Sequence, residues 1–280
     1  MICFMFPGQP LTFEGTVPDD SDFRQVTALT LERTGLNLAD CACRGEGLTE
    51  HVRLQVYGVA MSRYHCRRLR REGTVPDIIA EHSMGIYPAM AACGALDDGD
   101  ALEMTYRIGA CIAAMGTRNT YALGCITGLT AAPLMAVAEN NGAFLANYNT
   151  SRHFLLSGER RNVEDAVAEA RESGAFTARS FPCDAPLHSP LMEEVAGELR
   201  NIVGDYRFRE PVLPLMNHID QDYLAAADLP EFLVRELSLP VYWERTCRAL
   251  SDAGVSRFVE VGVGDSLKKY NRWIASEGGR

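Results

Sequence analysis

The stretch Asp77-Ile-Ile-Ala-Glu-His-Ser-Met-Gly85 combines a short apolar strand with a tight turn that leads into a helix. A serine at such a turn is pushed out of the strand, so its hydroxyl is exposed at the N-terminus of the helix. The backbone N–H of the next residue, Met84, can there face a developing oxyanion, and the small residue Gly85 lets the turn close. The pattern favours Ser83 as a nucleophile, although Glu81 stands where the usual motif has its first glycine. The alternative is a serine that caps a buried helix.

A nucleophilic serine needs a base, and the chain has six histidines. His82 adjoins Ser83, but neighbours at a strand end point to opposite sides, which argues against His82 as the partner. His188 lies in the proline-framed loop Cys183–Met192, which would return the chain to the edge of a cleft. We therefore expect His188 to be the base, while the pattern does not exclude His218. The histidines in polar surroundings, which we expect at the surface, are His51, His65 and His153.

Different patterns of apolar residues divide the chain. Ile2–Phe6 and Asp77–Ala80 are short apolar runs typical of buried strands, and Val52–Arg71 has the spacing of a helix. Residues 119–184 follow the order strand, helix, strand, strand, helix, strand, which is the plan of a ferredoxin-like unit. Residues after 190 return to alternating helices and strands, whereas residues 11–48 show no clear element.

The predicted fold is therefore α/β, with an α/β-hydrolase-like large subdomain and an inserted ferredoxin-like small subdomain. Residues 1–117 and 185–280 would form the catalytic body, and residues 118–184 would form the insertion. A cleft between the two parts would hold the ligand.

Composition and charge exclude several classes of protein. The 280 residues are 47% hydrophobic and 23% charged, as in globular proteins, and the net charge of −10 argues against a nucleic-acid-binding surface. No apolar stretch reaches the roughly 18 residues of a membrane span, and no basic leader opens the chain, so we expect a cytoplasmic protein. The nine cysteines are scattered and are expected to be reduced thiols. Cys41-Ala-Cys43 has no second pair at zinc spacing, so the sequence predicts neither a metal nor a cofactor.

Short motifs follow one another over nearly the whole chain. They are Phe6-Pro-Gly-Gln9, Gln55, Glu81-His-Ser-Met-Gly85, Ala146-Asn-Tyr-Asn149, Pro186-Leu-His-Ser-Pro-Leu-Met192, Leu239-Pro-Val-Tyr-Trp243 and Glu260-Val-Gly-Val-Gly264. Together they resemble the motifs of the malonyl-CoA:acyl carrier protein transacylases and of the related acyltransferase domains of polyketide synthases. Each motif is modest alone, but the ordered set is specific.

The resemblance implies an acyltransferase of fatty acid or polyketide synthesis. Ser83, activated by His188, would attack the thioester of an acyl-CoA, and the phosphopantetheine thiol of an acyl carrier protein would then take the acyl group. The backbone N–H groups of Gln9 and Met84 would form the oxyanion hole. The residues that the resemblance assigns to substrate binding are Gln55, Asn149 and the neighbours Arg107 and Ile108.

The resemblance also implies that a backbone carbonyl near Arg235–Pro240 orients His188. Glu236 stands where the family usually has glutamine or asparagine. We state as a hypothesis that its carboxylate stabilises the imidazolium and completes a Ser-His-Glu arrangement.

The sequence leaves the acyl group open. Malonyl-specific members carry an arginine directly before a glycine on the helix after the elbow, and this arginine binds the free carboxylate. An alignment without gaps places Ile108 there, with Arg107 one residue earlier and rotated by about 100° on the helix. Malonyl and an uncharged acyl group therefore both stay open. So do two other functions on this scaffold, an acyl hydrolase and a non-catalytic carrier-protein-binding subunit.

Overall fold

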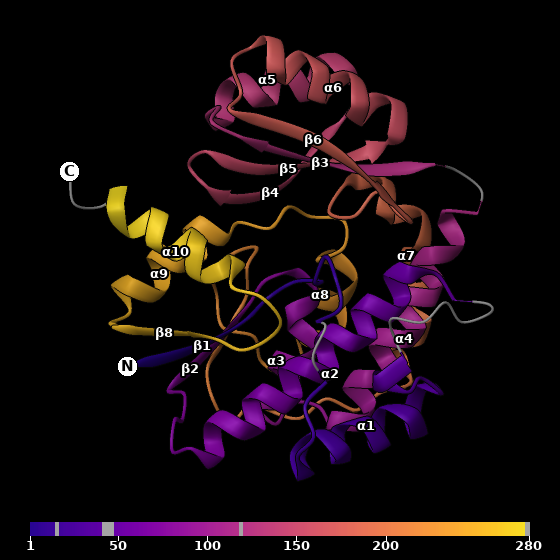
Figure 1. Ribbon diagram of the computed structural model, residues 1–280, viewed down its shortest axis with the longest axis vertical. Helices are drawn as coiled ribbons and strands as arrows, with labels where there is room; N and C mark the ends of the chain where they lie inside the picture. The colour runs from indigo at the N-terminus through magenta and orange to yellow at the C-terminus, as the bar shows by residue number, and fades with distance from the viewer. Residues whose placement is uncertain (15–16, 41–47, 118–119, 278–280) are drawn as a thin grey trace.

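The computed structural model describes residues 1–14, 17–40, 48–117 and 120–277, and Figure 1 shows that the chain is built around two separate sheets. One sheet is parallel and the other antiparallel. This arrangement confirms the predicted fold class. Cys41-Ala-Cys43 lies outside the described residues.

A four-stranded parallel sheet forms the centre of the body. Its strands are β1 (Ile2–Phe6), β2 (Ile78–Glu81), β7 (Leu215–Met216) and β8 (Arg257–Glu260), in the order β7-β2-β1-β8. Along β1, Cys3 and Met5 belong to one hydrophobic cluster, and Phe4 and Phe6 belong to another. A strand that is buried on both faces has no polar side, which explains its continuous apolar run.

Helices cover both faces of this sheet (Figure 1). Helices α9 (Trp243–Asp252) and α10 (Ser266–Glu277) contribute to the cluster that contains Cys3 and Met5. The helices that contribute to the opposite cluster are α1 (Ser21–Thr34), α2 (Glu50–Arg71), α3 (Ile86–Ala92), α4 (Asp98–Met115), α7 (Ala196–Gly204) and α8 (Leu229–Arg235). Short 3₁₀ turns stand at Leu38–Asp40, Ser83–Gly85 and Pro190–Val195.

The second sheet has the predicted ferredoxin-like plan. Its elements, in chain order, are β3 (Tyr121–Thr127), α5 (Ala131–Asn141), β4 (Phe144–Thr150), β5 (His153–Glu159), α6 (Arg160–Glu172) and β6 (Thr177–Cys183). The strands pair antiparallel in the order β4-β5-β3-β6, and α5 and α6 share a hydrophobic cluster with them. The division of the chain at residues 118–184 stays a prediction.

The segment after α8 connects the two sheets. The backbone N–H of Tyr148 on β4 donates to the carbonyl of Val241 at 2.7 Å, and the N–H of Val241 donates to the carbonyl of Ala146 at 2.8 Å. The N–H of Tyr242 donates to the carbonyl of His218, which follows β7, at 3.0 Å. These bonds hold the edge of the antiparallel sheet against the carboxyl end of the parallel sheet.

The sequence pattern did not predict helices α1 and α10. In α1, only Phe23, Val26 and Thr30 are buried, so its apolar periodicity is faint. Local signals define its ends: the Asp20 side chain accepts from the N–H of Phe23 at 2.9 Å, and Gly35 ends the helix in the left-handed conformation. Within the described part of the chain, no helix has both the length and the apolar character that a membrane crossing requires.

Candidate active site

A sharp turn at the end of β2 presents Ser83. Its φ of 56° lies in the left-handed region, which is strained for a side-chain-bearing residue and is common at functional sites. The N–H of His82 donates to the carbonyl of Phe6 at 3.0 Å, so the turn lies directly against the end of β1. A Cβ at Gly85 would overlap the carbonyl oxygen of Phe6 and lie 2.7 Å from its carbonyl carbon. The expectation that a small residue lets this turn close is therefore confirmed.

His188, which lies in the loop that follows β6, contacts Ser83. Its Nε2 lies 2.6 Å from Oγ of Ser83. Its Nδ1–H donates to the backbone carbonyl of Glu236 at 2.8 Å, and the carbonyl of Leu239 lies 3.2 Å from the same nitrogen. This contact fixes the tautomer, because a proton held at Nδ1 leaves Nε2 free to accept the serine proton. His188 also has a φ of 57°, and its backbone N–H donates to the carbonyl of Leu237 at 2.7 Å.

Burial keeps the His188 imidazole neutral. Loss of solvent lowers its pKa to about 3, with a smaller contribution from the neighbouring His218. A neutral imidazole with a free Nε2 is the form that a general base requires.

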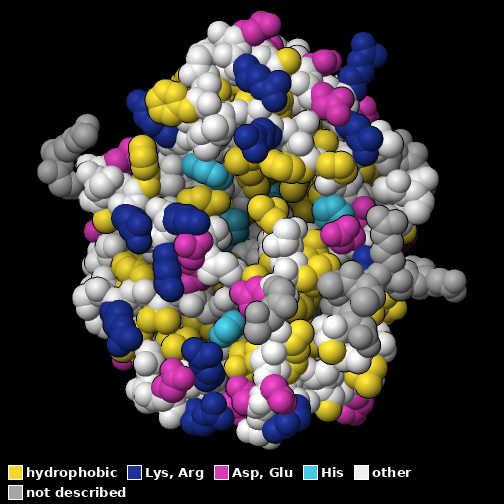
Figure 2. Space-filling model, viewed as in Figure 1, with side chains coloured by type: hydrophobic (Ala, Val, Ile, Leu, Met, Phe, Trp, Pro, Cys, Tyr) yellow, Lys and Arg dark blue, Asp and Glu magenta, His cyan; other side chains and the backbone are white. Residues whose placement is uncertain are grey.

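A small cavity of about 30 Å³ lies beside Ser83. The residues that line it are Gln9, Gln55, Ser83, Met84, Tyr87, Thr105, Ile108, Ile112, Leu187, Glu236 and Leu237. This lining brings Ser83 together with the predicted oxyanion residues Gln9 and Met84 and with the predicted substrate residues Gln55 and Ile108. In Figure 2, the surface is hollowed between the antiparallel sheet and the helical body, and histidine side chains surround the hollow.

The structure places Arg107 outside the cavity beside Ser83, and its assignment to substrate binding stays a prediction. Its guanidinium donates to Asp205 at 2.6 Å and to the hydroxyl of Tyr206 at 3.3 Å, and it lines a separate, more open hollow. Ile108, one position further along α4, faces the cavity instead. The rotation of about 100° between neighbours on a helix separates the two side chains.

The structure places Asn149 against two histidines outside the cavity lining, and its assignment to substrate binding stays a prediction. Its Oδ1 lies 2.9 Å from Nε2 of His82, and its Nδ2 lies 3.0 Å from Nδ1 of His153. Asn149 is buried behind the turn and is not among the residues that line the cavity. It connects β4 to the turn that carries Ser83. His153, which we expected at the surface, is only partly exposed because it belongs to this contact.

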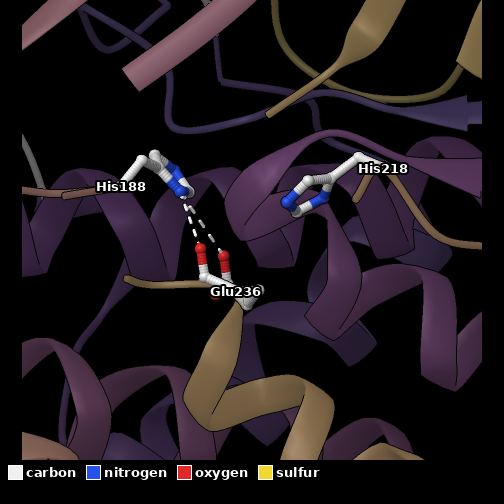
Figure 3. A group of neighbouring side chains, drawn as sticks. All are labelled: His188, His218 and Glu236. Atoms are coloured by element: carbon white, nitrogen blue, oxygen red, sulfur yellow. Dashed lines mark hydrogen bonds and ion pairs between the residues drawn. The ribbon is translucent and has the colours of Figure 1, made fainter. Parts of the chain in front are cut away.

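The backbone carbonyl of Glu236 accepts the Nδ1–H of His188 at 2.8 Å, in the segment where the resemblance implies a carbonyl that orients the histidine. The carboxyl group of Glu236 is fully buried, and Oε2 lies 3.9 Å from Nδ1 of His188, beyond hydrogen-bond distance (Figure 3). Burial raises the pKa of the Glu236 carboxyl well above its usual value, and the nearby Glu81 adds to this. The hypothesis of a Ser-His-Glu arrangement is therefore not supported in this conformation.

Sequence reasoning missed a buried contact between Glu81 and His218. Nδ1 of His218 lies 2.8 and 2.7 Å from the two carboxyl oxygens of Glu81, and Oε1 also accepts the backbone N–H of His218 at 3.0 Å. Burial raises the pKa of Glu81 and lowers that of His218 to about 3, so the two groups share a proton as a neutral pair. The available signal was topological, since Glu81 ends β2 and His218 follows the adjacent parallel strand β7, whose register pairs Ala80 with Met216.

Among the described residues, one group of side chains comes close enough to hold a metal ion: His188, His218 and Glu236 (Figure 3). One possible ligand atom from each residue lies within 4.8 Å of the other two. The Nδ1 of His188 carries the proton that it donates to the carbonyl of Glu236. This nitrogen is therefore occupied while His188 serves as a base.

Comparisons with known proteins show which proteins this chain is similar to. The chain is 30% identical to the malonyl CoA-acyl carrier protein transacylase of Bacillus subtilis (strain 168), over 97% of this chain and 90% of the relative. It is similar in structure to the acyl-carrier-protein S-malonyltransferase of Burkholderia pseudomallei, with a TM-score of 0.89, 25% identity and coverage of 98% and 92% of the two chains. It also resembles a malonyl-transacylase solved in complex with its type II polyketide synthase acyl-carrier protein, with a TM-score of 0.91, 25% identity and coverage of 98% and 93%.

The family model for the acyl transferase domain matches residues 24–267. This range holds Ser83, His188 and Glu236 and most of both sheets. The resemblance seen in the ordered motifs is thereby confirmed, and the chain belongs to the acyl transferase domain family.

Proposed function

We propose that this protein transfers a short acyl group, malonyl or a related one, from CoA to the phosphopantetheine thiol of an acyl carrier protein. The transfer would proceed through an acyl-serine intermediate, in fatty acid or polyketide synthesis. The observation that carries the proposal is the 2.6 Å contact between Oγ of Ser83 and Nε2 of His188 at the wall of a cavity. The relatives named as malonyl transacylases support it.

In the first half-reaction, Oγ of Ser83 attacks the thioester carbonyl carbon while Nε2 of His188 takes the hydroxyl proton. The tetrahedral intermediate carries its negative charge on the former carbonyl oxygen, which the backbone N–H groups of Gln9 and Met84 would stabilise. The carbonyl oxygen of Glu236 faces Nδ1 and stabilises the imidazolium that forms. When the C–S bond breaks, the proton on Nε2 passes to the CoA sulfur, and the acyl group remains on Ser83.

The second half-reaction reverses these roles with a new thiol. Nε2 of His188 takes the proton of the phosphopantetheine thiol, whose sulfur attacks the acyl-serine ester. The intermediate collapses, the proton returns to Oγ of Ser83, and the acyl carrier protein leaves with a new thioester. One residue thus serves as base and acid in turn, which requires that His188 keep the orientation that its contact with Glu236 provides.

We also propose a cytoplasmic location. Six cysteines in the described part of the chain are free thiols, namely Cys3, Cys66, Cys93, Cys125, Cys183 and Cys247. Unpaired cysteines in this number fit a reducing compartment.

Intact-mass measurement tests the proposed function. The full chain is incubated with malonyl-, acetyl- and butyryl-CoA, with and without a holo acyl carrier protein. We expect an acyl adduct on the wild type, its absence in Ser83→Ala, and its loss to the carrier protein when that protein is added. Release of free acid without a carrier would instead indicate an acyl hydrolase. Carrier-protein binding without any adduct would indicate a non-catalytic subunit.

A further inference from the structure

Residues 236–239, which follow α8 and are called the orienting segment below, hold His188 in place. Nδ1 of His188 lies 2.8 Å from the carbonyl oxygen of Glu236 and 3.2 Å from that of Leu239, and its backbone N–H donates to the carbonyl of Leu237 at 2.7 Å. The position of the imidazole relative to the nucleophile therefore depends on where this segment lies. The segment forms turns outside any helix or strand, so contacts with other parts of the chain must fix its position.

His218 contacts the chain on both sides of the orienting segment. Its ring packs against Phe232 on α8, four residues before the segment, with 5.8 Å between the ring centroids. Its carbonyl accepts the N–H of Tyr242, three residues after the segment, at 3.0 Å. The same ring lies nearly perpendicular to the imidazole of His188, with 6.1 Å between the centroids, and points toward Glu236 (Figure 3). His218 thus supports both the base and the segment that orients it.

Glu81 connects His218 to strand β2. Oε1 of Glu81 accepts the backbone N–H of His218 at 3.0 Å, and Nδ1 of His218 lies 2.8 and 2.7 Å from the two carboxyl oxygens. Both side chains have 0% exposure, so these bonds form without competition from solvent. Glu81 is the last residue of β2 and stands two positions before Ser83. The strand that presents the nucleophile is therefore connected to the residue that supports the base.

Stability alone does not explain a polar pair at this place. Burial of a carboxyl and an imidazole costs free energy, and apolar side chains of similar size would fill the space without that cost. Hydrogen bonds are directional, however, whereas apolar contacts are not. The bonds from Glu81 fix the plane and the position of the His218 ring, and that ring in turn packs against His188.

We propose that Glu81 and His218 are positioning residues of the proposed acyl transfer. Together they hold the orienting segment where it keeps Nε2 of His188 at 2.6 Å from Oγ of Ser83. Neither residue is among those that line the cavity, so both act through His188 and not on the substrate. This inference rests on the proposed function and adds two residues to the same site. Loss of the connection lets the base shift, and a displacement of about 1 Å costs roughly 100-fold in rate.

Two reactions of Ser83 in the full chain test the proposal. The first is formation of the acyl-serine from malonyl-CoA or butyryl-CoA over a range of concentrations. The second is labelling by a small fluorophosphonate, in which Oγ displaces fluoride from phosphorus; this reaction needs the base and uses no CoA thioester. Intact masses of samples quenched at successive times give a rate constant and a final amplitude. A variant that merely unfolds lowers the amplitude, whereas a displaced base lowers the rate constant.

Two single variants break the connection at different points. His218→Leu removes the ring, and Glu81→Leu removes its hydrogen-bond partner. Each should slow both reactions by about 10–100-fold. The acyl-CoA concentration at half-maximal rate should stay within about threefold of the wild-type value, because the cavity lining is unchanged. The double variant should be no slower than the slower single variant, since both substitutions break the same connection.

Two further variants separate this role from general effects of substitution. In Glu81→Gln, the amide oxygen can accept the N–H of residue 218 and the amide nitrogen can donate to Nδ1, so both rate constants should stay within about threefold of the wild-type values. The matched control is His65→Leu, the same substitution at a partly buried histidine on α2 outside the cavity lining. It should leave both rate constants unchanged.

Four results would overturn the proposal: wild-type rate constants in His218→Leu, single losses that multiply in the double variant, equal slowing by Glu81→Gln and Glu81→Leu, or an effect confined to the half-maximal concentration. Failure of the proposed function looks different. Labelling of the wild type without acyl-serine from any thioester would overturn acyl transfer, while the labelling rates of the variants would still decide the role of the pair. An absence of both reactions would overturn both proposals.

Discussion

Substitution of Gly85 by alanine should disable the enzyme through a single added methyl group. A Cβ at this position would overlap the carbonyl oxygen of Phe6, and it would lie 2.7 Å from the Phe6 carbonyl carbon and 2.9 Å from the carbonyl oxygen of Pro7. All three atoms belong to the backbone and cannot rotate away. The turn and the end of β1 must therefore move apart.

This movement is expected to lower both the stability of the protein and the rate of acylation. Overpacking of this kind costs about 1–3 kcal/mol, which corresponds to a decrease of several degrees in Tm for a chain of this size. Ser83 lies within the displaced turn, so its 2.6 Å contact with His188 would lengthen. A displacement of about 1 Å at a reacting group costs roughly 100-fold in rate. We therefore expect acylation to slow by about two orders of magnitude while most of the protein remains folded.

The acylation rate is checked by intact-mass measurement of the acyl-serine in samples quenched at successive times. The change in stability is checked by the Tm from thermal unfolding. Gly197→Ala is the matched control, because Gly197 lies exposed on α7 and a Cβ there would meet no atom within 4 Å. That substitution should be neutral or stabilise the helix by about 0.5–1 kcal/mol. If Gly85→Ala were acylated within about threefold of the wild-type rate at an unchanged Tm, the close approach described here would not matter for function.

Further predictions concern the proposed base His188, the buried pair of Glu81 and His218, and Arg107, which lies outside the cavity. His188→Ala should slow acyl-serine formation by about 10²–10⁴-fold, and a smaller loss would mean that another group takes the proton. Since burial lowers the pKa of His188 to about 3, the base stays unprotonated far below pH 6.5, so kcat/KM for acylation should remain flat from pH 8 to pH 5; a decline centred near pH 6.5 would contradict this. Glu81→Ala should lower the free energy of unfolding by about 1–3 kcal/mol in urea titrations, because it leaves the buried, neutral imidazole of His218 without its hydrogen-bond partner, and a loss below about 0.5 kcal/mol would show that the pair is not needed for stability. Arg107→Ala should leave the malonyl-to-butyryl ratio in competition unchanged and cost at most about 1 kcal/mol in stability, since its ion pair with Asp205 is partly exposed.

Sequence reasoning found the elements whose pattern is local. The apolar run Ile2–Phe6 predicted a buried strand because both faces of β1 are covered. The alternation of strands and helices after residue 119 predicted the ferredoxin-like unit, since each element there has a regular hydrophobic face. Helix α1 was missed because few of its residues are buried, which leaves little periodicity to detect.

The exposed turn at Ser83 and the placement of His188 beside it were predictable for different reasons. Ser83 follows a strand and opens a helix, and this local order already defines the exposed turn. His188 was favoured by its loop and by the resemblance, but its 2.6 Å contact with Ser83 joins residues 105 positions apart in the chain. The hydrogen bond from its Nδ1 to a backbone carbonyl could not be derived from side-chain identities, because every residue has such a carbonyl.

The chain alone determined the two-part α/β fold, the turn that presents Ser83 and the family, because these depend on spacing and on the order of motifs. Tertiary packing decided the rest. It places Ile108 at the cavity and Arg107 outside it, brings Glu81 to His218 from adjacent strands, and buries the Glu236 carboxyl where no described residue forms a hydrogen bond with it. The physical reason is that the charge state and orientation of a side chain depend on what surrounds it, and those surroundings come from segments that are remote in sequence.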